Sequence, residues 1–362
     1  MARRSSSSSR PATLADVARL AGVVAMTASR AINSSGYVSD DVRKRVQKAA
    51  AKLNYRPNML ARQLKGRRLN AIGILLPDIA NPFSTELIGG VKEVFDAEGY
   101  TTFIATSNRS VEQENASLQS FIDHRVDGLV VATRGTSMGD GILCDIASQN
   151  IPLVTIGRPV RSPKIDSVTA NHYQGAFDAV KHLIGLGHTR IGFIGVAPQD
   201  GKLLRRYEGY VAALREARIK PEKQYTVGPA DAPAFATQED GYEGLLQLAR
   251  LSRPPTAIFA RNDFAAIGAL HAAHTLGLSI PGDMAIAGFD NIPLAAFTRP
   301  PLTTVEQPIA LQGRTAARFL LDRIRGDAVR SRQTMMECRL VVRESTDKSS
   351  KSVIGKGYES SI

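Results

Sequence analysis

The sequence predicts an α/β protein in which a small all-α segment precedes a larger body built of doubly wound parallel sheets. Three observations support this. The first 69 residues carry fifteen Lys or Arg against three Asp, an excess equal to the +12 net charge of the whole chain. Apolar residues in that segment follow helical spacing. From residue 71 onward, apolar runs of strand length alternate with amphipathic helical runs, as in βαβ units.

The charge distribution separates two roles. Beyond residue 69 the chain carries thirty-one basic and thirty-one acidic side chains and is neutral. Because the segment is polycationic and the body is neutral, we expect only the segment to bind a polyanion. Nucleic acid is the expected partner, because each phosphate that a basic side chain neutralises releases counterions.

Length and composition exclude several classes of protein. A chain of 362 residues favours two or three domains. Cys144 and Cys338 are too few for a disulfide framework or a metal cluster, so we expect no metal and no cofactor. The sequence shows no P-loop, dinucleotide fingerprint or nucleophile elbow, and we therefore predict that it is not an enzyme. It shows no signal peptide and no membrane span, which predicts a cytoplasmic protein without a membrane partner.

The basic segment predicts a helix-turn-helix. Thr13 and Asp16 form a capping box for a first helix, and Gly22 supplies the turn after it. A second helix is expected from about Val24 to Ile32. A third begins at Ser39, with acidic residues in its first turn and the apolar stripe Val42, Val46, Ala49, Ala50 and Leu53.

A short hinge helix is expected next. Pro57 stops the third helix, Asn58 can cap a new one, and Gly66 ends it. With about eight residues, such a helix is too short to be stable alone.

An ordered motif string resembles the LacI/GalR family of bacterial transcription regulators. Its parts are Thr13-Leu14-Ala15-Asp16-Val17-Ala18, Ala21-Gly22-Val23, Thr27-Ala28-Ser29-Arg30-Ala31-Ile32-Asn33, Gly36-Tyr37-Val38-Ser39, Leu53-Asn54-Tyr55-Arg56-Pro57-Asn58 and Ala61-Arg62-Gln63-Leu64. The resemblance extends to a closing strand, Leu340–Thr346. It implies a headpiece at 13–57, a hinge at 58–69, and an effector-binding and dimerisation domain at 70–346. Residues 1–12 and 347–362 are expected to be disordered tails.

The resemblance also implies DNA contacts. The second helix would enter the major groove, where Ala25 and Met26 face base edges and read them through apolar contacts. Leu64 would wedge between base steps in the minor groove. The departure at Val24, where relatives have Ser, removes a helix cap. The full set of expected DNA-binding residues is Thr13, Ala25, Met26, Thr27, Ser29, Arg30, Asn33, Tyr37, Ser39, Tyr55, Asn58, Ala61 and Leu64.

The neutral body predicts parallel strands covered on both faces, because its strand-like runs are continuously apolar. These runs are Ala71–Pro77, Thr101–Thr106, Gly128–Thr133, Ile151–Ile156, Ile191–Val196, Thr256–Ala260 and Met284–Phe289. The helical segments between them are Thr85–Glu98, Gln113–His124, Gln174–Leu186, Arg206–Ala217 and Phe264–Leu276. The resemblance implies two lobes of periplasmic-binding-protein type with a cleft between them. The chain would break near 166–171 and return near 301 and 334.

Polar residues at strand ends are candidate effector ligands, because ligands of such sheets bind at the carboxyl ends of the strands. A sugar-like molecule suits Arg, Asn and Asp side chains beside an aromatic face. The candidates at strand ends are Asp78, Phe83, Asn108, Arg158, Asn262 and Asp290, and the resemblance adds Arg206, which occupies the family position two residues before Glu208. Gly157 and Ala170 stand where relatives often have Asp, and this loss of carboxylates beside two Arg favours an acidic or phosphorylated ligand. The expected effector is therefore a sugar, sugar acid or sugar phosphate.

These features predict an effector-responsive, sequence-specific DNA-binding transcription regulator. Most relatives repress, so we expect a repressor that binds a pseudo-palindromic double-stranded DNA operator as a homodimer. Two alternatives remain at this point: an intracellular solute-binding protein, and a DNA-architectural protein that works without an effector.

Overall fold

The computed structural model describes residues 12–33, 36–55, 69–108, 110–132, 139–195, 205–228, 237–327 and 330–347. The chain divides into two compact units, Met1–Leu69 and Asn70–Ile362. The predicted hinge residues Asn58, Ala61 and Leu64 lie outside the described residues, as do most of the two predicted tails.

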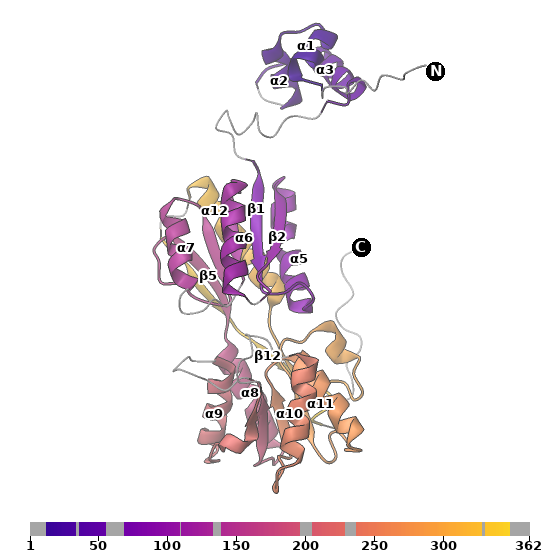
Figure 1. The fold of residues 1–362 in the computed structure, drawn as a ribbon, viewed down its shortest axis with the longest axis vertical. Coiled ribbons are helices and arrows are strands. Elements are labelled where there is room, and N and C mark those ends of the chain that lie inside the picture. The colour runs from indigo at the N-terminus through magenta and orange to yellow at the C-terminus, as the bar shows by residue number, and fades with distance from the viewer. Residues whose placement is uncertain are drawn as a thin grey trace, which may run out of the picture. The chain divides into compact units, whose positions relative to one another are not determined.

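The described part of the N-terminal unit contains three helices, α1 (Leu14–Ala21), α2 (Ala25–Ile32) and α3 (Asp40–Lys52) (Figure 1). The expected capping box is present, with the Thr13 hydroxyl accepting from the Asp16 amide at 3.3 Å and the Asp16 carboxylate accepting from the Thr13 amide at 3.0 Å. Gly22 ends α1 with φ of 65°, a left-handed conformation that glycine adopts without strain. The helices enclose a core of Val17, Ala18, Ala21, Ala28, Ala31, Val46 and Ala49.

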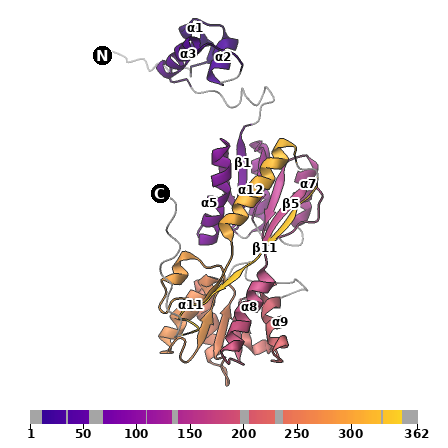
Figure 2. The same ribbon diagram turned by 180° about the vertical axis from the view of Figure 1, so that it is seen from behind.

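The larger unit consists of two lobes, and the first is built on a six-stranded parallel sheet. Helices α5 (Pro82–Ala97) and α12 (Ile309–Arg325) pack together on one face, and α6 (Val111–Asp123) lies on the other (Figures 1 and 2). Helix α7 spans Gly139–Ser148. The strand order is β11 (Gln333–Met336), β5 (Ile165–Ala170), β4 (Leu153–Ile156), β3 (Gly128–Val131), β1 (Ala71–Leu76) and β2 (Thr101–Thr106).

The second lobe holds a four-stranded parallel sheet in the order β7 (Thr226–Val227), β6 (Ile191–Ile194), β8 (Ala257–Ala260) and β9 (Ala285–Ala287). Helices α8 and α9 share one core cluster with it, and α10 and α11 share another, so both faces are covered. These helices are α8 (His172–Gly185), α9 (Arg205–Glu216), α10 (Gln238–Ala249) and α11 (Asp263–Thr275). The doubly wound α/β architecture predicted from the sequence is confirmed, and in the described residues we find no helix long and apolar enough to span a membrane.

The chain passes between the lobes at 170–172, at Gln307 and Pro308, and at Glu337 and Cys338. The second passage was expected near Pro301 but occurs six residues later. The reason is that β10 (Thr304–Glu306), which follows Pro301, still pairs with β12 (Arg339–Val341) in the second lobe. The first passage falls at the end of the expected range 166–171, whose earlier residues form most of strand β5. Short 3-10 helices at Lys223–Tyr225 and Pro293–Ala296 complete the described elements.

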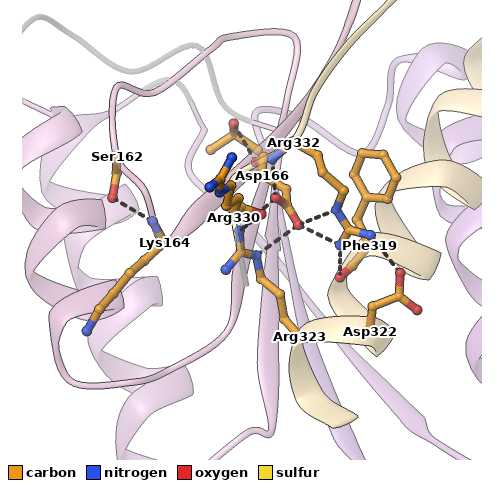
Figure 3. A network of polar contacts seen from close by, with 9 residues as sticks. Ser162, Lys164, Asp166, Phe319, Asp322, Arg323, Arg330 and Arg332 are labelled. Carbon is orange, nitrogen blue, oxygen red and sulfur yellow. Dashed lines mark hydrogen bonds and ion pairs between the residues drawn. The ribbon is translucent and has the colours of Figure 1, made fainter. Parts of the chain in front are cut away.

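A buried carboxylate explains how β5 contains polar residues. Asp166 is fully buried and accepts hydrogen bonds from Arg323 at 2.7 and 2.8 Å, and from the Arg332 guanidinium and backbone amide at 2.6 to 3.3 Å (Figure 3). Arg332 also lies over the ring of Phe319 at 4.0 Å. This network joins β5, β11 and α12.

Candidate functional site

The start of α2 exposes two large apolar side chains. Ala28 and Ala31 are buried against α1 and α3, whereas Val24 and Met26 are 70% and 65% exposed. Val24 occupies the N-cap position and makes no side-chain capping hydrogen bond, as expected for valine. The helix therefore presents its first turn outward, with uncapped backbone N–H groups at its positive end.

The ten expected DNA-binding residues that the structure describes fall into two groups. Ala25, Met26, Arg30, Tyr37 and Ser39 are exposed, and Thr27 and Ser29 are half-buried on α2. The others serve local structure: Thr13 caps α1, the Asn33 side chain donates to the Ser29 carbonyl at 2.8 Å, and Tyr55 packs against the helical core. The first group contains all the exposed side chains among these residues, whereas Thr13, Asn33 and Tyr55 are half-buried.

The second lobe gathers Arg206 and Asp290 into one buried cluster. Arg206 donates to an Asp290 carboxylate oxygen at 3.0 Å and to the Arg261 carbonyl at 2.6 Å. Its guanidinium lies 3.8 Å from the centre of the Phe289 ring. Gln307 donates to the same Asp290 oxygen at 2.6 Å. An anionic side chain thus lies between two donors that come from different elements.

The backbone at Asp290 is strained. Its φ is 116°, in a region that non-glycine residues rarely adopt, and it is followed by Asn291 with φ of 54°. Such a conformation costs on the order of 1–3 kcal/mol and persists only where neighbouring contacts enforce it. Here the backbone amide of Asp290 donates to the Val305 carbonyl at 2.8 Å, and the carboxylate points at Arg206.

Asn262 and its neighbour Asp263 are also buried in the second lobe. Asn262 caps α11 by accepting from the Ala265 amide at 2.9 Å. Asp263 accepts from the Thr304 hydroxyl at 2.5 Å and from the Ile292 amide at 2.8 Å. Burial, and then the nearby Asp290 carboxylate, raise the pKa of Asp263 to about 8. Asp263 is therefore held neutral at pH 7.

In the first lobe, Arg158 is already paired. Its guanidinium lies 3.5 Å from Glu114 and 3.4 Å from Asp140, and its side chain is 11% exposed. Glu114 is itself buried on α6. Two carboxylates therefore surround the cation that follows β4.

The remaining candidates lie at the ends of β1 and β2. Asp78 turns back to accept from the Ala80 amide at 2.8 Å, and Phe83 is half-buried against the core of the first lobe. Asn108 has φ of 43°, is exposed, and donates to Gln113 at 2.9 Å. These three residues are on the surface of the first lobe or at the edge of its core, whereas Arg206, Asn262 and Asp290 are buried in the second.

Sequence reasoning missed several members of the buried clusters. Phe289 and Arg261 directly precede predicted candidates, so their strand-end positions were a usable signal. No such signal was available for Glu114 or Gln307. Glu114 resembles an ordinary surface residue of a helix, and Gln307 follows a strand that is too short to predict from the sequence. His172, whose ring nitrogen lies 3.5 Å from Arg206, begins α8 at the first passage between the lobes.

Comparison with known proteins places these features in one family. Residues 13–58 match the bacterial regulatory proteins of the lacI family, and residues 180–346 match a periplasmic binding protein-like domain. The HTH-type transcriptional repressor CytR of Escherichia coli K12 is 36% identical over 341 residues, covering 92% of this chain and 96% of that protein. This chain belongs to the lacI family.

Further relatives cover a similar span. The ribose operon repressor of Haemophilus influenzae is 35% identical over 92% of this chain and 98% of its own length. A Lac repressor dimer bound to operator and an anti-inducer matches with a TM-score of 0.81 and 28% identity, covering 93% of this chain and 99% of that one. A CelR–cellobiose complex matches with a TM-score of 0.68 and 30% identity over 92% and 99%. The lacI-family protein described here is a DNA-binding transcription regulator, as its sequence predicted.

Proposed function

We propose that this lacI-family protein is a cytoplasmic repressor without enzymatic activity that binds a pseudo-palindromic operator as a homodimer and responds to a small effector. The observation that carries the proposal is the exposed first turn of α2 on the unit that holds the chain's whole net charge. Basic side chains would supply phosphate affinity, and Ala25 and Met26 would select bases.

The proposed effector site is the buried cluster around Asp290. Arg206, Asn262 and Asp290 are its main residues, with Arg158, Asp78, Phe83 and Asn108 contributing from the first lobe. Effector binding would alter DNA affinity only through a difference in its affinity for two arrangements of the protein. The three passages between the lobes are where such a change would be transmitted.

Selection from random double-stranded DNA by the full-length protein tests the proposal. We expect enrichment of a pseudo-palindrome bound at least about 10³-fold more tightly than random DNA at matched salt. A ratio near one would instead support the architectural role, and no DNA binding at all would support a solute-binding protein.

The hinge assignment has its own test. Leu64→Ala is expected to weaken binding to the selected operator by about tenfold or more, and to leave binding to random DNA nearly unchanged. The wedge acts only once the hinge helices form on the correct site. Equal losses on both DNAs would show that Leu64 has no such role.

A further inference from the structure

The first turn of α2 exposes three consecutive apolar residues. Val24 is 70% exposed, Met26 is 65% exposed, and Ala25 between them is also exposed. None of the three side chains carries a hydrogen-bond donor, and the sulfur of Met26 is only a weak acceptor. Neighbouring exposed apolar side chains indicate a binding surface more strongly than scattered ones do.

The polar residues of α2 lie elsewhere on the helix. Thr27 is half-buried, and the half-buried Ser29 hydroxyl accepts from the Asn33 side-chain amide at 3.3 Å. Arg30 is in the last turn, where its Cδ would lie 3.6 Å from a methyl group added at Gly36. The helix therefore presents apolar groups at its start and its one cation at its end.

The charge of the N-terminal unit identifies the partner of this apolar turn. The unit carries an excess of basic residues equal to the whole +12 net charge of the chain, so it attracts nucleic acid. In the major groove of B-DNA, the apolar group on a base edge is the C5-methyl of thymine. The edges of a G·C pair present hydrogen-bonding groups, which these three side chains cannot match.

We propose that Val24, Ala25 and Met26 together read thymine methyl groups, and that Val24 is a specificity-determining residue. At least one thymine in each operator half-site places its methyl group against the side chain of Val24. A serine at this position would direct its hydroxyl to the backbone of α2 as a cap, whereas valine adds two methyl groups to the exposed surface. This inference rests on the proposed function and deepens it, because it names the chemical group of the operator that α2 recognises.

Deoxyuridine tests the methyl group, because it keeps every hydrogen-bonding group of thymine and lacks only the C5-methyl. In the operator selected by the full-length protein, each thymine is replaced in turn, in both half-sites together, and binding is measured by fluorescence anisotropy at constant salt. We expect at least one position where affinity falls about fifteenfold, since burial of one methyl group contributes about fourfold in each half-site. Equal affinity at every position would overturn the inference and leave the proposed function intact. A protein that selects no operator would overturn both.

5-Methylcytosine separates the methyl group from the hydrogen bonds of the base. At the sensitive position, cytosine lacks both the methyl group and the O4 acceptor of thymine, and 5-methylcytosine restores only the methyl group. We expect an operator with 5-methylcytosine there in both half-sites to bind about fifteenfold more tightly than one with cytosine. Equal binding of the two would show that thymine is read through O4, which contradicts the inference.

Val24→Ala and Val24→Ser test the residue, because both remove the two methyl groups of valine. Val24→Ala leaves α2 without a side-chain cap and Val24→Ser supplies one, so the pair controls for the stability of the helix. In both variants we expect the ratio of affinities for the thymine and deoxyuridine operators to fall from about fifteenfold to about twofold or less at a sensitive position. An unchanged ratio in both would remove Val24 from the reading set. A ratio that falls only in Val24→Ser would assign the effect to capping and would also exclude Val24.

Discussion

Asp166 and Asp263 are both fully buried aspartates, and their surroundings give them different charge states. Burial alone would raise the pKa of Asp166, but hydrogen bonds from Arg323 and Arg332 hold it below its ordinary value. Burial, and then the neighbouring Asp290 carboxylate, raise the pKa of Asp263 to about 8, and its hydrogen bonds from the Thr304 hydroxyl and the Ile292 amide offset only part of this rise. The same residue type is thus an anion in one lobe and a neutral acid in the other.

The raised pKa of Asp263 predicts a dependence of stability on pH. Its pKa lies above the ordinary 3.8, so the folded state binds a proton that the unfolded state releases. The contribution is complete below about pH 4 and is lost as pH rises toward 8, with a slope of up to about 1.4 kcal/mol per pH unit. Urea unfolding between pH 5 and 8 measures this slope. Asp263→Asn should flatten it, and an unchanged slope in that variant would assign the dependence elsewhere.

Replacing Val24 with a residue that can cap α2 should increase the stability of that helix. Val24 occupies an N-cap position with extended backbone and is 70% exposed, so replacing it removes little packing. Val24→Ser should stabilise α2 by about 1 kcal/mol by supplying the missing cap. Hydrogen exchange of the α2 amides in the full-length protein measures the change, with Val24→Ala as a control expected to show none. Equal protection in both variants would mean that serine does not cap here.

At the same scale, the candidate site was predictable only in part. Asn262 and Asp290 were identified because polar residues at strand ends are a visible pattern, and Arg206 was identified from the family resemblance. Glu114, which pairs with Arg158, and Gln307, which pairs with Asp290, were not identified, because pairing depends on which distant elements meet. The expectation of an acidic ligand came from counting arginines without their carboxylate partners, which only the folded structure provides.

Pairs of helices approach each other through glycine. A methyl group added at Gly268 of α11 would overlap the Gln238 carbonyl of α10, and one at Gly241 would overlap the Ala265 carbonyl. On α12, a methyl at Gly313 would lie 2.6 Å from the Leu87 carbonyl of α5. Each lobe therefore contains helix pairs whose backbones are in contact, and these pairs should move as rigid bodies.

Two glycine-to-alanine substitutions distinguish the effect of helix propensity on stability from the effect of close contact between helix backbones. Gly268→Ala should destabilise the protein by about 2 kcal/mol or more, because overlap outweighs the propensity gain. At Gly89 of α5 an added methyl would have no heavy atom within 4 Å, so Gly89→Ala should stabilise by up to about 1 kcal/mol. Chemical denaturation compares the two variants. Similar effects at both positions would contradict the packing at α10 and α11.

Elements with uniform apolar runs were predictable, and those with polar residues were not. All seven predicted strands of the body are present, shortened by at most three residues at their ends. Strand β5 was missed because Asp166 and Ser167 in its sequence resemble a loop, and only Arg323 and Arg332 make them compatible with burial. β7, β10 and β11 are two to four residues long and owe their pairing to neighbours distant in sequence.

For the whole molecule, the charge distribution predicts that the two units fold and bind their partners independently. Deleting residues 1–69 should leave a compact body that unfolds cooperatively and remains dimeric, and this body should be neutral because its 31 basic and 31 acidic side chains balance. DNA binding should be lost with the basic unit. Calorimetry, light scattering and fluorescence anisotropy measure the three properties. A truncated protein that unfolds without cooperativity, or still binds DNA, would contradict the division.

The three passages between the lobes also govern the order in which the protein can be made. The core of the first lobe includes Ile309, Ala316, Leu320 and Ile324 of α12, which are synthesised after the second lobe's main sheet. The second lobe in turn needs β12 and the Ser345 hydroxyl, which donates to the Ile286 carbonyl at 2.6 Å. Neither lobe can therefore complete its core until residues 309–345 have left the ribosome. At about 5–20 residues per second, the nascent chain spends several seconds with incomplete cores, when it is most exposed to chaperones and proteases.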